Sequence, residues 1–352
     1  MIKKNNDKIN NIFKKKKYQC MIVAEISANH EGKLSNVLKI IDSAKKIGVD
    51  AIKIQLYKAD KITLDSFKKD FLIKSNNTWK KYKSLFNLYK KAQTPYSWYD
   101  KINSYCKKKN IILFSSVFDL DTINFLEKKN CPIYKIASPE ITDIPLIKKA
   151  ANTKKPIFLS SGLSNYKDLS LAIKTLKEIK CKKIVLMKCT SAYPAPHDEI
   201  NLMTMLDFKK KFNVEIGFSD HTRGIETSIA AVALGAKVIE KHITLKQKKN
   251  SVDGFFSSDL KEFEKLVKSI RNIEKNLGKI TYNVSKSSKK NLAGKKSLYV
   301  IKNINKNEIF TSDNFSSIRP AFGLHPKYYA IILGKKAKKN LKIGDRIKKS
   351  LY

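Results

Sequence analysis

Two histidines, His221 and His242, each follow a short apolar run that has the pattern of a buried strand. One helix-like stretch, from Gly224 to Leu234, lies between these two runs. A strand–helix–strand order makes the two strands parallel neighbours in one sheet, so both histidines should lie at the same C-terminal edge. Two adjacent imidazoles at such an edge predict a divalent metal site, although two structural histidines would show the same spacing.

Charged residues interrupt other apolar runs. Glu25 lies within the run Ile22–Ile26, and Lys53 lies within the run Ala51–Gln55. Burying a bare charge is costly, so each of these side chains needs a partner. If the sheet closes into a barrel, the first strand lies beside the last, and we expect Glu25 to neighbour His242.

Eight short runs rich in β-branched residues alternate with helical patterns. The runs are Ile22–Ile26, Ala51–Gln55, Ile111–Ser115, Ile133–Ile136, Ile157–Ser160, Lys183–Lys188, Glu215–Ser219 and Val238–His242. Apolar residues at spacings of three and four are clearest in Leu34–Ile47, Thr122–Lys129, Leu169–Ile179 and Leu260–Leu277. This alternation predicts an α/β fold of the (β/α)8 TIM-barrel class, in which functional groups gather at the C-terminal ends of the strands.

The pattern divides the chain into four parts. Residues 1–20 predict a basic, disordered tail, 21–280 a TIM-barrel domain, 281–296 a polar linker, and 297–352 a small C-terminal domain. Within the barrel, residues 57–96 form a long insertion after the second strand. A loop of this length at the catalytic end of a barrel is usually a lid or a wall of the substrate site.

Hydroxyl groups, lysines and acids gather at the predicted strand ends. Besides the residues above, they are Ser116, Lys135, Ser138, Glu140, Ser161, Lys188, Ser191 and Ser219. Hydroxyls, backbone N–H groups and lysines together suit a phosphate, and a metal with an open position suits activation of a carbonyl. The set predicts a phosphate-bearing substrate that meets a carbonyl compound at a metal, although any one serine could serve only a turn or a cap.

Composition limits the other classes of function. The net charge of +41 would suit nucleic acid or an anionic membrane, but the lysines are dispersed along the whole chain, which favours compositional bias. The five cysteines form no CxxC pair, which indicates a reducing cytoplasm. The N-terminus has no apolar core of a signal peptide, and no apolar run approaches the ~20 residues of a membrane span.

Six segments together resemble the sialic acid synthase family, and the likeness runs from about Met21 to the C-terminus. The segments are Ala24–His30, Ile52–Gln55, Tyr134–Ser138, Lys188–Pro194, Ser219–Thr222 and Glu240–His242. The resemblance implies a TIM barrel followed by an antifreeze-like (SAF) domain. It also implies condensation of phosphoenolpyruvate with an N-acetylated amino sugar and release of phosphate. It further implies a domain-swapped homodimer in which Arg319 of one subunit reaches the sugar's N-acetyl group in the other.

The same resemblance implies roles for single residues. His221 and His242 would hold Mn²⁺ or Mg²⁺, and Glu25 and Glu140 would take part in catalysis. Phosphoenolpyruvate would contact Lys53, Lys135, Ser138, Ser161, Ser191 and Ser219. The remaining substrate contacts would be Gln55, Ser116, Tyr193, Asp253 and Arg319.

Several segments are more similar to pseudaminic acid synthases than to other members of the family. They are Ser27–His30, Lys58–Leu64, Val252–Ser257 and Gly323–Tyr329. The implied sugar is 2,4-diacetamido-2,4,6-trideoxy-altrose, with an N-acetylneuraminate or legionaminate synthase as the alternative. Val117, Leu56 and Ser161 stand where the family usually has other residues. Ser161 keeps a hydroxyl for phosphate contacts, whereas Leu56 and Val117 leave the fine substrate preference open but not the reaction type.

Two unrelated functions remain as alternatives. A Schiff-base aldolase on the same barrel could use Lys188 as its nucleophile, but this interpretation ignores both histidines. A basic binding protein that recognises nucleic acid would leave the residues at the strand ends unexplained.

Overall fold

A computed structural model describes residues 2–14, 19–75, 77–249 and 251–352. The chain divides into two compact units, one ending at Gly278 and one spanning Lys279–Tyr352.

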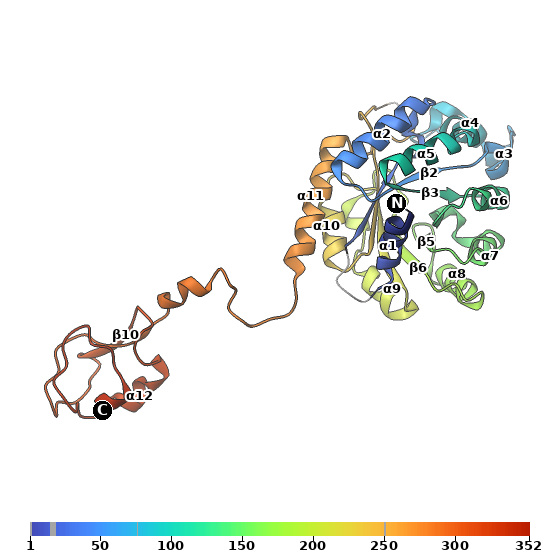
Figure 1. Ribbon diagram of the computed structural model, residues 1–352. Coiled ribbons are helices and arrows are strands. Elements are labelled where there is room, and N and C mark those ends of the chain that lie inside the picture. The colour runs from blue at the N-terminus through green and yellow to red at the C-terminus, as the bar shows by residue number, and fades with distance from the viewer. Residues whose placement is uncertain (1, 15–18, 76, 250) are drawn as a thin grey trace. The chain divides into compact units, whose positions relative to one another are not determined.

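Eight parallel strands close the first unit into a barrel (Figure 1), so the predicted TIM-barrel class is confirmed. The strands are β1 (Met21–Glu25), β2 (Ala51–Gln55), β3 (Ile112–Val117), β4 (Tyr134–Ile136), β5 (Ile157–Ser160), β6 (Ile184–Cys189), β7 (Glu215–Asp220) and β8 (Val238–His242). Nearly all of their residues are buried, because the barrel interior and the surrounding helices cover both faces of the sheet. In the register of the closed barrel, Glu25 pairs with Lys53 on one side and with His242 on the other. The expected neighbourhood of Glu25 and His242 is therefore confirmed.

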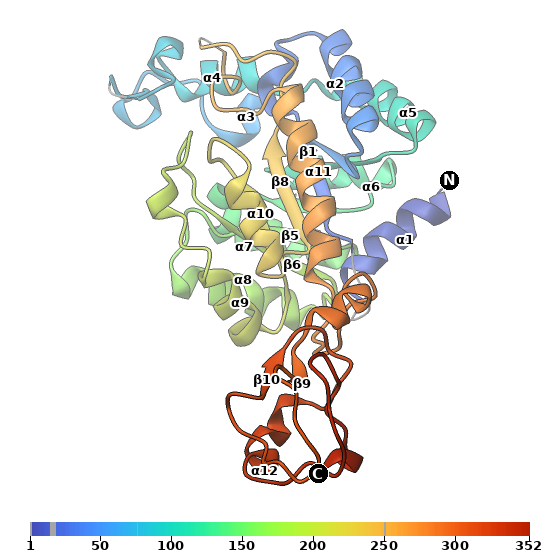
Figure 2. The same cartoon turned by 90° about the vertical axis from the view of Figure 1, so that its left-hand side faces the viewer.

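Helices surround this barrel. They are α2 (Leu34–Ile47), α3 (Ala59–Ile62), α4 (Leu85–Ala92), α5 (Tyr99–Lys109), α6 (Leu120–Lys128), α7 (Ile144–Asn152), α8 (Tyr166–Glu178), α9 (Thr204–Phe212), α10 (Glu226–Ala233) and α11 (Leu260–Leu277). Asp119, Asp143, Asn165 and Asp259 cap four of them by accepting a hydrogen bond from a backbone N–H of the first turn. Figure 2 shows α10 and α11 side by side outside β8, and α11 also contacts α2, which completes the ring.

The N-terminal segment folds into a helix, α1 (Ile2–Ile12), so the prediction of a disordered tail over 1–20 is wrong for its described residues. Ile9 and Ile12 are buried in the core of the barrel unit, and Phe13 packs against it. The Lys8 ammonium lies 2.8 Å from Asp50, and Lys183 donates a 2.8 Å hydrogen bond to Asn10. Three apolar residues at helical spacing were enough to anchor this segment, although lysine and asparagine dominate its composition.

The second unit is small and has its own core. Strands β9 (Ser297–Val300) and β10 (Phe315–Ile318) pair antiparallel, and helix α12 (Tyr329–Ile332) packs nearby. Phe310 and Phe315 meet edge to face with their ring centres 5.5 Å apart. The predicted linker residues 281–296 are exposed and belong to this unit, and they include a short 3-10 helix, Lys289–Gly294.

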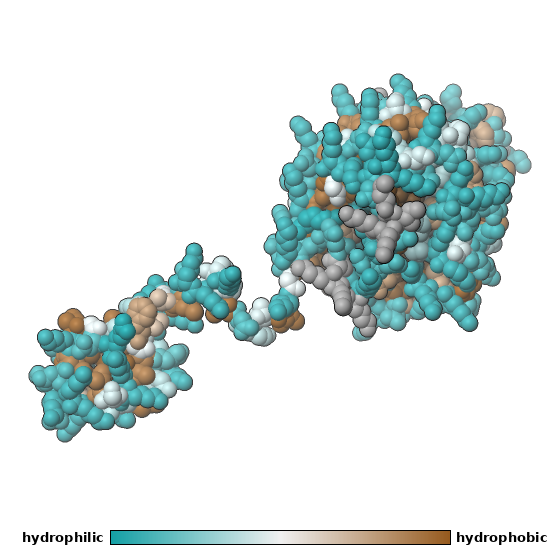
Figure 3. Space-filling view, viewed as in Figure 1, coloured by the Kyte–Doolittle hydropathy of each residue, from teal (hydrophilic) through white to brown (hydrophobic). Residues whose placement is uncertain are grey.

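Hydrophilic side chains cover most of the visible face of the barrel unit (Figure 3). The five cysteines are buried and carry no disulfide. Across the described part of the chain, no helix has the length and apolar character required to span a membrane.

Candidate active site

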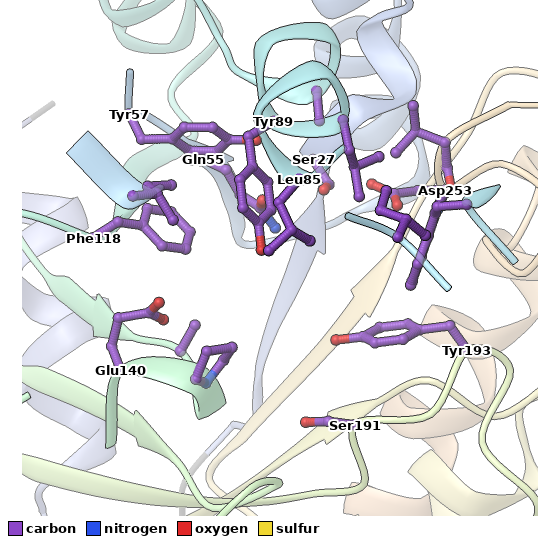
Figure 4. A pocket seen from close by; sticks show the side chains of 18 of the residues that line it. Ser27, Gln55, Tyr57, Leu85, Tyr89, Phe118, Glu140, Ser191, Tyr193 and Asp253 are labelled. Carbon is purple, nitrogen blue, oxygen red and sulfur yellow. Dashed lines mark hydrogen bonds between the residues drawn. The ribbon is translucent and has the colours of Figure 1, made fainter. Parts of the chain in front are cut away.

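A pocket of about 390 Å³ opens at the C-terminal ends of the barrel strands (Figure 4). Its floor comes from the strand ends, with Gln55, Glu140, Ser191, Tyr193 and His242 among the lining residues. The insertion 57–96 supplies the roof, as the sequence predicted of a substrate wall. The roof residues are Tyr57, Ile62, Ile73, Asn77, Trp79, Leu85, Leu88, Tyr89 and Ala92.

Four buried charges form one ion cluster at the base of this site. The Lys53 ammonium lies 2.5 Å from Glu25 and 2.9 Å from Glu240, and Lys135 lies 2.8 Å from the same oxygen of Glu240. Ser219 donates a 3.0 Å hydrogen bond to that oxygen as well. Each lysine is therefore paired, as the burial of its charge requires.

The pKa values in the cluster follow from burial and pairing. Burial lowers the pKa of Lys53 to about 7, although Glu240 opposes the shift. Burial would raise the pKa of Glu240, but Lys135 and Lys53 outweigh it and hold that pKa well below the ordinary value. An arriving anion would favour the charged form of Lys53, which suits this base to bind a phosphate or carboxylate.

Glu240 is a functional residue that the sequence reasoning missed. It lies inside the apolar run of β8, the same signal that singled out Glu25. Its partner lysines come from β2 and β4, far away along the chain, so no local pattern could show that they pair with Glu240. Glu240 also engages Ser219, which we had assigned to phosphoenolpyruvate alone.

Small polar groups meet beside the ion cluster. Gly162 N–H donates a 2.9 Å hydrogen bond to Ser138 Oγ, while the buried hydroxyls of Ser161 and Ser191 have no protein partner within the described ranges. A Cβ atom added at Gly162 would lie 2.3 Å from Ser191 Oγ and 2.7 Å from Ser138 Oγ. Because unsatisfied buried hydroxyls are rare, this arrangement is typical of an anion cradle that only glycine leaves open.

The two predicted metal ligands lie together, with their ring centres 5.4 Å apart. His221 Nδ1 is 2.9 Å from the Thr190 carbonyl oxygen, a contact that places the proton on Nδ1 and leaves Nε2 free to bind a metal. The buried His242 Nδ1 has no partner among the residues described. The donor set fits a divalent cation with two imidazole ligands, and no group of three or more His, Cys, Asp or Glu residues suited to a metal occurs in the described part of the chain.

The pKa values of the two histidines differ. Burial and the neighbouring His221 hold the pKa of His242 well below its ordinary value, so this imidazole is neutral. Burial would also lower the pKa of His221, but Cys189, the Thr190 carbonyl and Asp220 together outweigh burial and raise that pKa. A cation at Nε2 would displace the proton from His221, because only the neutral imidazole binds metal.

Two further acids border the pocket. Glu140 lies in a short 3-10 helix, Ser138–Thr142, and one of its oxygens is buried without a partner in the described structure. Burial raises the pKa of Glu140 to about 7. Asp253 accepts a 3.1 Å hydrogen bond from Ala28 N–H, and burial raises the pKa of its carboxyl group.

The other predicted residues lie in different surroundings. Tyr193 packs with its ring centre 4.4 Å from His221, and Gln55 lines the pocket. Ser116 accepts a 3.2 Å hydrogen bond from Lys53, so it supports the ion cluster. Arg319 belongs to the second unit and is exposed there. Lys188, the nucleophile of the aldolase alternative, donates to the Cys189 carbonyl and is not a lining residue of the pocket.

Comparison with known proteins supports the resemblance found in the sequence. A model of the NeuB family matches residues 40–282, and a model of the SAF domain matches residues 295–351. The chain is 44% identical to a pseudaminic acid synthase of Campylobacter jejuni strain 81-176 over 94% of this chain and 95% of that protein. It is 40% identical to the pseudaminic acid synthase of Helicobacter pylori over 94% of this chain and 98% of that one.

Solved structures agree with these sequence relatives. An N-acetylneuraminic acid synthetase from Leptospira borgpetersenii has a TM-score of 0.69 and 31% identity, covering 78% of this chain and 91% of that one. The spore coat polysaccharide biosynthesis protein SpsE from Bacillus subtilis has a TM-score of 0.64 and 28% identity, covering 95% of both chains.

Gly162→Ala should close the anion cradle without harming the fold. The new methyl group would occupy the space beside Ser138 and Ser191, so we expect affinity for phosphoenolpyruvate, measured by calorimetry, to fall at least about tenfold. The matched control is Gly294→Ala, where a Cβ atom meets nothing within 4 Å. Unchanged affinity in a folded Gly162→Ala protein would show that the phosphate binds elsewhere.

Proposed function

The chain belongs to the NeuB family, and from this premise we propose that it condenses phosphoenolpyruvate with 2,4-diacetamido-2,4,6-trideoxy-altrose. The products are pseudaminic acid, used in surface glycans, and phosphate. The enzyme is then a transferase that forms a carbon–carbon bond. The observation that carries the proposal is the ion cluster and anion cradle near the imidazole pair, next to a pocket that Ser191 and His242 help to line.

The sequence identity to this chain is higher for the pseudaminic acid synthases than for the relatives named after other sugars. The two pseudaminic acid synthases quoted above are 44% and 40% identical to this chain. The N,N'-diacetyllegionaminic acid synthase of Campylobacter jejuni is 38% identical over 93% of the chain, and the mouse N-acetylneuraminate-9-phosphate synthase is 31% identical over 75%. A legionaminate or N-acetylneuraminate synthase is therefore the second candidate. The aldolase alternative would use Lys188, whose ammonium donates to the Cys189 carbonyl, and it would leave both histidines without a role.

The floor of the pocket would bind phosphoenolpyruvate. Lys53 and Lys135 would share their positive charge between Glu240 and the substrate, and the hydroxyls of Ser138, Ser161 and Ser191 would donate to its phosphate oxygens. Ser219 would keep Glu240 in place rather than contact the phosphate directly. This arrangement holds the C3 carbon of phosphoenolpyruvate above the floor, where the open-chain aldehyde of the sugar can approach.

A divalent metal, Mn²⁺ or Mg²⁺, held by His221 and His242 would polarise the aldehyde oxygen. C3 of phosphoenolpyruvate then forms a bond to the aldehyde carbon, whose oxygen gains a proton, and C2 becomes electron-poor. Glu25 would position the aldehyde, and Asp253 would hold a sugar hydroxyl or a water molecule.

Water then adds to C2, and its proton passes to the Glu140 carboxylate. The tetrahedral intermediate breaks its C–O bond to the phosphate while its C2 hydroxyl passes a proton to the departing group, which leaves hydrogen phosphate and the 2-keto acid. The proton that Glu140 accepts from water balances the one gained by the aldehyde oxygen. Glu140 suits this role because it faces the pocket, its free oxygen has no protein partner in the described structure, and its pKa of about 7 is close to working pH.

A panel of sugars tests the proposal. Phosphate release should require both phosphoenolpyruvate and a sugar, and should be fastest with 2,4-diacetamido-2,4,6-trideoxy-altrose when compared with the legionaminic precursor and N-acetylmannosamine. A preference for one of the other two sugars would assign the alternative function.

The same assay tests the metal. Exhaustive chelation should abolish phosphate release and added Mn²⁺ should restore it, whereas activity that survives chelation would rule out the assigned role of the histidine pair.

The pH dependence of kcat tests Glu140. The carboxyl group is protonated below its pKa of about 7 and can accept a proton only above it, so kcat should rise with pH through this value. Glu140→Gln keeps the shape of the side chain but removes the base, and we expect kcat to fall roughly 100-fold and the rising limb to disappear. A limb that persists in the variant would belong to another group.

The SAF domain gives the basis for a proposed homodimer. In it, Arg319 of one subunit would reach the sugar bound in the other. We expect Arg319→Ala and His242→Ala to be inactive alone, and their co-expressed mixture to regain about a quarter of the wild-type activity, because half of the dimers then hold one intact site. No recovery in verified mixed dimers would place Arg319 in its own subunit's site.

The cysteines bear on the compartment. All five are buried thiols without disulfides, which fits the reducing cytoplasm that we propose. Cell fractionation with an antibody to the chain tests this assignment.

A further inference from the structure

The roof of the pocket carries a polar group that the reaction described above does not use. Helix α4 places Leu85 and Tyr89 four residues apart, so both side chains project from the same face. Both line the pocket, and Figure 4 shows the Tyr89 hydroxyl directed into its open centre, toward the space between Glu140 and Tyr193.

Tyr89 is held by packing and not by its hydroxyl. Its ring meets Tyr57 edge to face at 6.2 Å, and Tyr57 in turn meets Phe118 at 5.0 Å. The hydroxyl has no hydrogen-bond partner among the described residues, and burial raises its pKa above the ordinary value, so it stays a neutral O–H donor. A positioned donor without a protein partner is suited to a ligand acceptor.

Apolar side chains make up most of the roof around this hydroxyl, and Asn77 is a polar residue that lines the roof as well. Leu85 lies beside the hydroxyl, and Ile73 and Trp79 also line the roof. The Trp79 indole N–H already donates a 2.8 Å hydrogen bond to the Val252 carbonyl, so Trp79 offers the pocket only its ring. A hydrogen-bond donor beside apolar side chains matches an acetamido group, whose carbonyl oxygen accepts a hydrogen bond and whose methyl group is apolar.

The reaction fixes which acetamido group can reach the roof. The aldehyde carbon C1 must lie at the floor near His221 and His242, so the C2 substituent stays close to the floor. The C4 substituent lies two carbons farther along and extends toward the roof. On the basis of the proposed function, we propose that Tyr89 is a specificity-determining residue whose hydroxyl donates to the C4 acetamido carbonyl, while Leu85 packs against the methyl group.

A pair of sugars and a pair of variants test this assignment. The sugars are 2,4-diacetamido-2,4,6-trideoxy-altrose and its analogue with a hydroxyl at C4, whose oxygen lies two bonds closer to the carbon chain and cannot take the same contact. We expect Tyr89→Phe to lower kcat/KM about tenfold for the diacetamido sugar, the effect of one lost hydrogen bond, and to leave the analogue nearly unchanged. The matched control is Tyr57→Phe, which removes a neighbouring phenol hydroxyl from the same roof and should not change the ratio.

The possible outcomes separate this inference from the function on which it rests. If the wild-type chain releases phosphate with neither sugar, the proposed function fails. If it turns over the diacetamido sugar but Tyr89→Phe lowers kcat/KM equally for both sugars, the hydroxyl has only a structural role and the inference fails. A selective loss in Tyr57→Phe and not in Tyr89→Phe would assign the contact to Tyr57 instead.

Discussion

The shared pairing of Glu240 with Lys53 and Lys135 is the interaction on which the site depends. One carboxylate oxygen accepts hydrogen bonds from both ammonium groups and from Ser219. Breaking a buried ion pair by removing one partner typically costs about 3–5 kcal/mol, because the other charge is left uncompensated. The four groups come from four different strands, so only the closed barrel can assemble them.

The pocket has two chemically distinct ends. Ser191 and His242 line its floor, near the ion cluster, the anion cradle and His221, and all of these groups come from the barrel strands and the segments that follow them. Its roof, contributed by the insertion 57–96, is mostly apolar and aromatic. The anionic substrate therefore binds at the floor, and the apolar substituents of the second substrate lie against the roof. This difference between the two ends orients the substrates and so places their reacting atoms.

Much of this arrangement could be predicted from the sequence, because it follows from local pattern and barrel closure. The strands β2, β5 and β8 have the predicted bounds, and the neighbourhood of Glu25 and His242 follows from closing the ring. Glu240 and Tyr89 could not be predicted in the same way. The partners of Glu240 lie on distant strands, and the direction of the Tyr89 hydroxyl depends on how the insertion packs. Helix α1 was not predicted, because lysine dominates the composition of this segment and the spacing of Ile9, Ile12 and Phe13 was overlooked.

The anion cradle at Gly162 adds a constraint of another kind. Any side chain at this position collides with the hydroxyl groups of two other loops, so the backbone there is itself part of the recognition surface. Threonine could replace a serine of the cradle and keep the hydroxyl group. No other amino acid could replace Gly162, because every other residue carries a Cβ atom. Position 162, which follows β5, thus tolerates fewer substitutions than the serine positions around it.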